Sequence, residues 1–106
     1  MKTVRVTYIT KKEYAEQNKV NIRKVMSDLE GLNHSGILYH VCLSADGISF
    51  THTAFFHSAE DEKHLLELPS FKFFQEQLKM NGLESPPKQE LLSLVGSSKD
   101  LFSHKS

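Results

Sequence analysis

The chain has 106 residues, of which 13 are basic and 13 acidic, so its formal net charge is zero. This balance excludes the basic footprint on which binding to nucleic acid or to an anionic membrane surface depends. No apolar run approaches the roughly 18 residues of a membrane span. The single Cys42 excludes an internal disulfide and fits a reducing compartment. We therefore expect a one-domain cytoplasmic protein without a nucleic-acid or membrane partner.

Two elements are predicted in the first third of the chain. Residues 3–10 alternate between apolar and polar side chains, which predicts a strand with Tyr8 on its more apolar face. Residues 11–32 predict a long helix, because apolar side chains recur at the helical period. These side chains are Ala15, Ile22, Val25, Met26, Leu29 and Leu32. Asn18 falls on the same stripe, and residues 33–36 form the connection to the next strand.

The stretch 36–57 predicts two long strands joined at Asp46-Gly47. This dipeptide suits a two-residue type I′ turn, in which both central residues have positive φ. A turn of that length makes four cross-strand pairs, which are Ala45 with Ile48, Leu43 with Phe50, Val41 with His52, and Tyr39 with Ala54. The face that carries these pairs is apolar enough to be covered by helices. The opposite face is mixed, with Leu38, His40, Cys42 and Phe55 among its residues.

Two helices are predicted after the hairpin. Ser58 is a candidate N-cap, and an acidic run follows it in the first turn, where the helix dipole favours negative charge. This helix should end near Leu68, because Pro69 disfavours the helical conformation in the residue before it. Ser70 is a candidate cap for a further helix, which should end at Asn81-Gly82.

A last strand is predicted over residues 90–95, which are apolar on both faces. Residues 97–106 form a polar tail, in which Leu101 and Phe102 are able to dock. The element order is then β-α-β-β-α-β within residues 1–96. This order predicts an α+β, ferredoxin-like domain, in which a four-stranded antiparallel sheet has helices on one face. The uncovered sheet face keeps several apolar side chains, so we expect two copies to stack sheet against sheet as a homodimer.

Three local features in the second half follow a known order. A strand ends in Phe55-Phe56 and leads into the acidic helix start at residues 58–62, and the segment Leu68-Pro69-Ser70-Phe71 then breaks the helix and starts another. Over residues 3–96 this arrangement resembles the dimeric α+β barrel superfamily, and most closely its antibiotic-biosynthesis-monooxygenase-like family. The resemblance implies a homodimer whose two sheets form a barrel and a pocket between the sheet and the helices of each subunit. It also implies, for some members, oxidation of polyketides or degradation of haem with no bound redox cofactor.

Four polar residues interrupt the apolar layer expected between sheet and helices, three on the covered sheet face and one on the long helix that faces it. They are Tyr8, Asn18, Tyr39 and His52. Burying such a group without a partner costs on the order of 1–3 kcal/mol, so each needs a partner or a cavity. In a functional interpretation, His52 is a base or hydrogen-bond partner and Asn18 holds an oxygen, and both are candidate catalytic residues. The pocket walls, as candidate substrate-binding residues, are Tyr8, Tyr39, Phe56 and Phe74. In the alternative interpretation, the polar side chains only satisfy one another inside the core.

The remaining histidines and the cysteine favour no site. His40 and Cys42 lie two apart on one strand, and with His57 they invite a metal interpretation, but the spacing is weak and no second cysteine exists. We predict no metal and interpret His40 and Cys42 as a packed pair in the dimer interface. His64 and His104 are interpreted as surface residues.

Two classes of function therefore stay open. One is a cofactor-independent monooxygenase, or an isomerase, that acts on a small aromatic or polyketide-like compound. The other is a non-catalytic ligand-binding or structural dimer. A cavity that reaches His52 and Asn18 from solvent favours the first class, and a filled core at that place favours the second.

Overall fold

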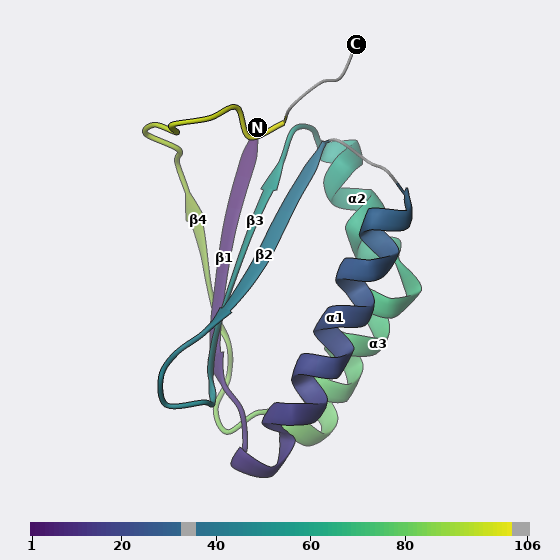
Figure 1. Cartoon of the computed structure of the whole chain (residues 1–106), viewed down its shortest axis with the longest axis vertical. Helices are drawn as coiled ribbons and strands as arrows, with labels where there is room; N and C mark the ends of the chain where they lie inside the picture. The colour runs from purple at the N-terminus through teal and green to yellow at the C-terminus, as the bar shows by residue number, and fades with distance from the viewer. Residues whose placement is uncertain (33–35, 103–106) are drawn as a thin grey trace.

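The computed structural model describes residues 1–32 and 36–102, which form a four-stranded antiparallel sheet with all helices on one of its faces (Figure 1). The strands are β1 (Lys2–Ile9), β2 (Ile37–Leu43), β3 (Ser49–Phe56) and β4 (Lys88–Leu92). They are ordered β2-β3-β1-β4 across the sheet. This is the α+β, ferredoxin-like arrangement predicted from the sequence.

The helical layer consists of three α-helices with short extensions. They are η1 (Lys12–Tyr14), α1 (Ala15–Leu32), α2 (Ala59–Glu67), α3 (Pro69–Gln77) and η2 (Leu78–Gly82). The helix predicted over residues 11–32 thus begins with a 3₁₀ turn. The final element, η2, is one turn of π-helix, in which the Leu83 N–H donates to the Leu78 carbonyl at 3.2 Å.

A proline separates α2 from α3, as predicted. Ser58 caps α2, since its side chain accepts a hydrogen bond from the Asp61 N–H. Leu68 is extended (φ −65°, ψ 123°), and Pro69 occupies the first position of α3, where its missing N–H is no loss. The prediction that Ser70 caps α3 is wrong, because Leu68 is the cap residue and Ser70 already lies inside the first turn.

The hairpin register is confirmed, but its turn is longer than predicted. Leu43 pairs with Phe50, and the pairs further along β2 and β3 agree with the sequence pattern. The Ser44 N–H then donates to the Ser49 carbonyl at 2.9 Å, so residues 45–48 form a four-residue loop and not a type I′ turn. The Asp46 carboxylate accepts from the Ile48 and Ser49 N–H groups, both at 2.9 Å, which stabilises the wider loop.

The last strand is shorter and earlier than the predicted range 90–95. Leu92 stands opposite Thr3, and β1 begins only one residue before Thr3. Pairing therefore ends at Leu92, and Leu94 and Val95 continue beyond the sheet. The expectation that this strand is covered on both faces is wrong for the single chain, since Leu91 and Val95 are largely exposed.

The hydrophobic core lies between the sheet and the helices, where buried side chains of β1 and β3 meet those of α1 to α3. The segment after β4 returns towards the end of β3, where the Phe102 ring packs edge-on against the His57 ring at 5.4 Å. The start of β1 and the last described residues of the chain lie at the same end of the molecule (Figure 1). The predicted connection at residues 33–35 and the surface assignment of His104 fall outside the described residues.

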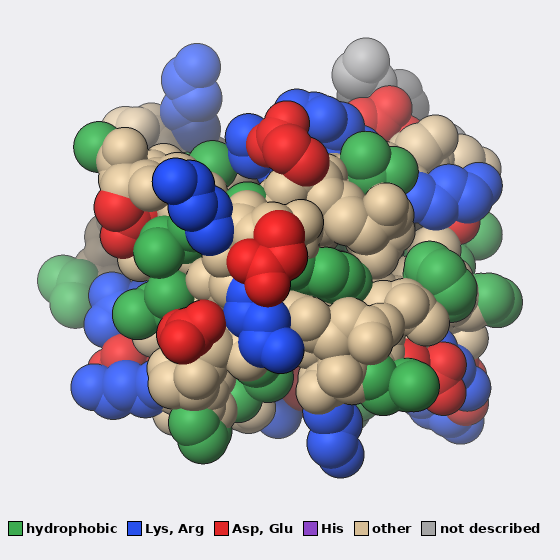
Figure 2. Space-filling view, turned by 90° about the horizontal axis from the view of Figure 1, so that it is seen from below, with side chains coloured by type: hydrophobic (Ala, Val, Ile, Leu, Met, Phe, Trp, Pro, Cys, Tyr) green, Lys and Arg blue, Asp and Glu red, His purple; other side chains and the backbone are tan. Residues whose placement is uncertain are grey.

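Charged side chains of both signs alternate over the face that Figure 2 shows, without a patch of one sign. This distribution agrees with the zero net charge. Within residues 1–32 and 36–102, no helix has both the length and the hydropathy needed to cross a membrane.

Candidate ligand site

A cavity of about 760 Å³ lies between the sheet and the helices α2 and α3, and it opens to solvent. Its sheet wall comes from β1 and β3, where Val4, Val6, Ala54 and Phe56 face the helices. Its helix wall is mostly apolar and includes Leu65, Leu66, Phe71, Phe74 and Leu78. Residues of the connection before β4, from Leu83 to Pro87, complete the lining. The cavity is thus predominantly apolar, with a few polar side chains, as in typical small-molecule sites.

Three polar side chains of the sheet form a hydrogen-bonded row at this cavity. The Tyr8 hydroxyl lies 2.6 Å from His52 Nε2, and the Tyr39 hydroxyl lies 2.6 Å from His52 Nδ1. All three residues line the cavity. Both ring nitrogens of His52 are therefore engaged by tyrosine hydroxyls, and neither is left to contact a ligand directly.

The register of the sheet explains why these residues meet. His52 stands opposite Val6 on β1 and opposite Val41 on β2. Tyr8 and Tyr39 lie two residues away from those positions, on the same face, since side chains of a strand alternate between its two sides. The row therefore runs diagonally over β1, β3 and β2, beneath the helical layer.

Asn18 is a fourth member of the hydrogen-bonded row and lies behind it, on α1. Its Nδ2 donates to the Tyr8 hydroxyl at 2.9 Å, and its side chain is completely buried. Asn18 does not line the cavity. Its Oδ1 is buried and has no hydrogen-bond partner among residues 1–32 and 36–102. Asn18 thus contacts the site only through Tyr8.

Burial sets the charge state of the row. Desolvation lowers the pKa of His52 from 6.5 to about 4, because the low-dielectric surroundings disfavour the imidazolium. Burial likewise raises the pKa of the Tyr8 and Tyr39 hydroxyls, since it disfavours the phenolate. Near neutral pH the row is therefore uncharged, and only one of the two ring nitrogens of His52 carries a proton.

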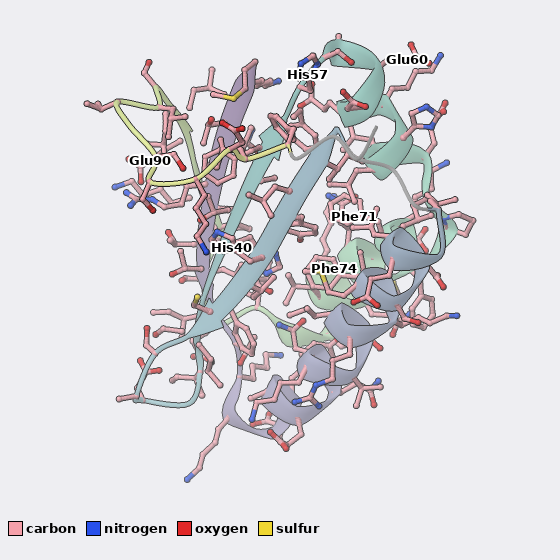
Figure 3. The ribbon with its side chains drawn as sticks, turned by 45° about the horizontal axis from the view of Figure 1, so that its top comes forward. His40, His57, Glu60, Phe71, Phe74 and Glu90 are labelled. Carbon is pink, nitrogen blue, oxygen red and sulfur yellow. The ribbon has the colours of Figure 1, made fainter. Side chains whose placement is uncertain are left out.

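Aromatic packing fixes the His52 ring. The Phe74 ring stacks on it at 5.3 Å with an interplanar angle of 30°, and the Phe71 ring meets Tyr39 edge-on at 6.2 Å. Figure 3 shows Phe71 and Phe74 on α3, directed into the layer between helices and sheet. A flat aromatic ligand thus finds aromatic walls next to the polar row.

The structure brings together five of the six residues that the sequence predicts for the site. Tyr8, Tyr39, His52, Phe56 and Phe74 line one cavity, whereas Asn18 lies behind it. The prediction missed Phe71, which follows the same helical spacing as Phe74 and was recognisable from it. It also missed the segment of residues 83–87, for which the sequence carries no signal, because a polar and proline-rich connection has no periodicity to place it.

The outer sheet face offers no metal site. Among residues 1–32 and 36–102, no group of three or more His, Cys, Asp or Glu side chains is arranged to hold an ion. Cys42 is a free, exposed thiol, and the His40 ring packs near that of Phe55 at 6.3 Å. His40 and Cys42 lie on the face opposite to the cavity, because side chains alternate along β2 and Tyr39 lines the cavity.

Several solved structures share this fold at low sequence identity. A candidate antibiotic biosynthesis monooxygenase from Nitrosomonas europaea superposes with a TM-score of 0.74 at 14% identity, covering 89% of both chains. Another from Caulobacter crescentus gives a TM-score of 0.72 at 18% identity, covering 90% of both. SnoaB, a cofactor-independent oxygenase from Streptomyces nogalater, gives 0.68 at 10% identity, covering 93% of this chain and 97% of that one. No family model and no curated protein matches the sequence.

These comparisons define the class of fold. The chain has the α+β fold of structures described as antibiotic biosynthesis monooxygenases, as the resemblance in the sequence implied. Identities of 10–18% establish the architecture and leave activity to be argued from the site itself.

Proposed function

We propose that this protein is a homodimer that binds a small, largely apolar aromatic molecule in the cavity of each subunit. The open cavity with the Tyr8–His52–Tyr39 row in its wall is the observation that supports this proposal most directly. Its volume of about 760 Å³ lies within the roughly 300–1,000 Å³ of small-molecule sites. A filled core would have favoured a purely structural role.

The experiment is a thermal-shift screen with quinones, polycyclic polyketide-like aromatics and haem. A ligand that binds only the folded state raises the melting temperature with increasing concentration. The matched variant is Leu66→Trp, which places bulk in the cavity lining at a half-exposed position and so does not disturb the buried core. Stabilisation of the wild type that this variant lacks supports the proposal. A panel without effect on the wild type contradicts it.

We propose, as the enzymatic form of this function, a cofactor-independent monooxygenase. Its chemistry oxidises an activated methylene of an aromatic compound to a ketone: the methylene loses two hydrogens, and dioxygen supplies one oxygen atom to the product and one to water. The substrate itself provides the electrons, so no flavin or metal is required. The Tyr39 hydroxyl at the end of the neutral row supports it, because this hydroxyl is able to donate a hydrogen bond to a substrate carbonyl oxygen, on which negative charge develops when the methylene loses a proton.

Oxygen consumption with anthrone tests the enzymatic form. Anthrone carries a methylene between two aromatic rings and is converted to anthraquinone and water by one equivalent of dioxygen. We expect uptake above the uncatalysed rate in the wild type and a loss of at least about tenfold in Tyr39→Phe, because removing one hydrogen-bond donor to a developing oxyanion costs roughly 10²–10³-fold in rate. Binding of anthrone without faster uptake would leave a non-catalytic binding protein.

The dimer is proposed from the uncovered sheet face and the chain beyond β4. Apolar side chains remain accessible there, namely Ile9, Leu92, Leu94 and Val95. Accessible apolar area of this kind marks an interface in many proteins. We also place the protein in the cytoplasm, since a free exposed Cys42 thiol persists in a reducing compartment.

A further inference from the structure

The hydrogen-bonded row has more hydrogens than its internal bonds use. Neutral His52 carries one N–H, and Tyr8 and Tyr39 carry one O–H each, which makes three hydrogens. Only two bonds join these three side chains, Tyr8 to His52 and His52 to Tyr39. One hydroxyl hydrogen therefore remains without an acceptor inside the row, whichever ring nitrogen of His52 is protonated.

The hydrogen bond from Asn18 and the burial of Tyr8 together indicate which hydroxyl this is. The Asn18 Nδ2 can only donate, so it occupies the Tyr8 oxygen as an acceptor. If Tyr8 then donates to Nε2, His52 is protonated on Nδ1 and donates to the Tyr39 oxygen. If Nε2 instead carries the proton, the Tyr8 oxygen accepts two hydrogen bonds. The free hydrogen then sits on the Tyr8 hydroxyl, and Tyr8 is only 5% exposed. The first direction leaves the free hydrogen on Tyr39, which is half-buried and lines the cavity.

We propose that the site selects ligands with an acceptor oxygen, such as a ketone or quinone carbonyl, which the Tyr39 hydroxyl binds. We further propose that Asn18 is the positioning residue that directs this hydroxyl towards the cavity. The inference rests on the proposed ligand-binding function and names the chemical group that is recognised. Both ring nitrogens of His52 are occupied, so the row offers a ligand one donor and no vacant nitrogen acceptor.

The protonation site of His52 is the first test, and it needs no variant. Nitrogen NMR of ring-labelled protein distinguishes the protonated from the unprotonated nitrogen by chemical shift. The proposal requires the proton on Nδ1 and an unprotonated Nε2. A proton on Nε2 reverses the direction of the row and overturns the role given to Asn18 and Tyr39.

A matched pair of probes tests the selection itself. Fluorenone and fluorene have nearly the same shape and differ by a carbonyl in place of a methylene. We expect wild-type protein to bind fluorenone about three- to tenfold more tightly, which corresponds to the net contribution of one hydrogen bond. Tyr39→Phe should bring this ratio close to one without weakening fluorene. Asn18→Asp should do the same, because a carboxylate accepts from Tyr8 and reverses the row.

The control is a second buried tyrosine–asparagine pair outside the cavity lining. Asn21 Nδ2 donates to the Tyr14 hydroxyl at 3.3 Å, and neither residue lines the cavity. Asn21→Asp therefore makes the same change in a similar setting and should keep the wild-type ratio. Its melting curve also separates a loss of selection from a general loss of stability.

The outcomes are distinct. Equal binding of fluorenone and fluorene by the wild type overturns the inference and leaves the binding function standing. Binding of neither probe overturns the proposed function and the inference with it. A ratio that falls in Tyr39→Phe and persists in Asn18→Asp overturns the positioning role of Asn18.

Discussion

At the scale of single residues, the site depends on one neutral histidine held between two tyrosine hydroxyls. His52 is 5% exposed, and both of its nitrogens are hydrogen-bonded. A buried polar network of this kind stabilises the fold only while each member keeps its partner. It also makes the fold sensitive to any change that charges or removes the ring.

Acid should destabilise the protein through His52. Its pKa falls from 6.5 in the unfolded chain to about 4 in the folded protein. Between these values the unfolded state binds the additional proton, so stability is complete above pH 6.5 and declines as the pH falls towards 4. The total is about 3 kcal/mol. Urea unfolding at pH 7 and pH 4 measures it, and in His52→Gln the difference between the two pH values should be smaller by that amount. Identical pH dependence in the two proteins would exclude His52 as its origin.

Replacing His52 with Phe should affect binding and stability together. The Tyr8 hydroxyl loses its acceptor inside the core, which costs about 1–3 kcal/mol and lowers the melting temperature by several degrees in a domain of this length. The polar row at the cavity is lost as well, so the stabilisation by an aromatic ketone should decrease.

Tyr14→Phe is the matched comparison for His52→Phe, since it removes a buried hydroxyl that is not part of the cavity lining. It should keep the ligand response. Full ligand stabilisation in His52→Phe would mean that the row takes no part in binding.

At the scale of elements, strand periodicity carried most of the predictive information. Alternation placed Tyr8, Tyr39 and His52 on the faces that helices cover, and the Asp-Gly position fixed the register of Tyr39 against His52. Loop length was not predictable in the same way, because two- and four-residue loops about the same centre give the same pairing. The helix wall of the cavity was not predictable either, because its distance from the sheet depends on how α2 and α3 pack and not on the spacing of their residues.

Gly47 is the position at which the hairpin loop is most sensitive. Its φ is +79°, a conformation that β-branched residues adopt only with strain. Gly47→Val should therefore destabilise the protein by roughly 1–3 kcal/mol, whereas Ala45→Val in the same loop should cost less. Thermal unfolding compares the two. Equal melting temperatures for wild type and Gly47→Val would contradict the loop conformation described above.

At the scale of the whole molecule, one sheet face is covered by helices, and the other is open to a second copy of the chain. Glu90 (Figure 3) pairs with Arg5 on the open face at 2.8 Å, and apolar side chains remain accessible beyond β4. Stacking two such faces would bury the exposed leucines near β4. The cavity lies on the helical side, so each subunit would keep its own site accessible.

Leu94→Lys should weaken this association. Leu94 is partly exposed just beyond β4, and a charge placed in an apolar interface without a partner is strongly unfavourable. Sedimentation equilibrium at micromolar concentration should give a dimer for the wild type and a larger monomer fraction for the variant. A wild-type protein that sediments as a monomer would refute the dimer.

The central claim is that the cavity beside the Tyr8–His52–Tyr39 row is a ligand site. A crystal structure of the protein with fluorenone tests it most directly. We expect density for the tricyclic ligand against Phe71 and Phe74, with its carbonyl oxygen within hydrogen-bonding distance of the Tyr39 hydroxyl. Fluorenone bound elsewhere, with the cavity closed by its own side chains, would contradict the claim.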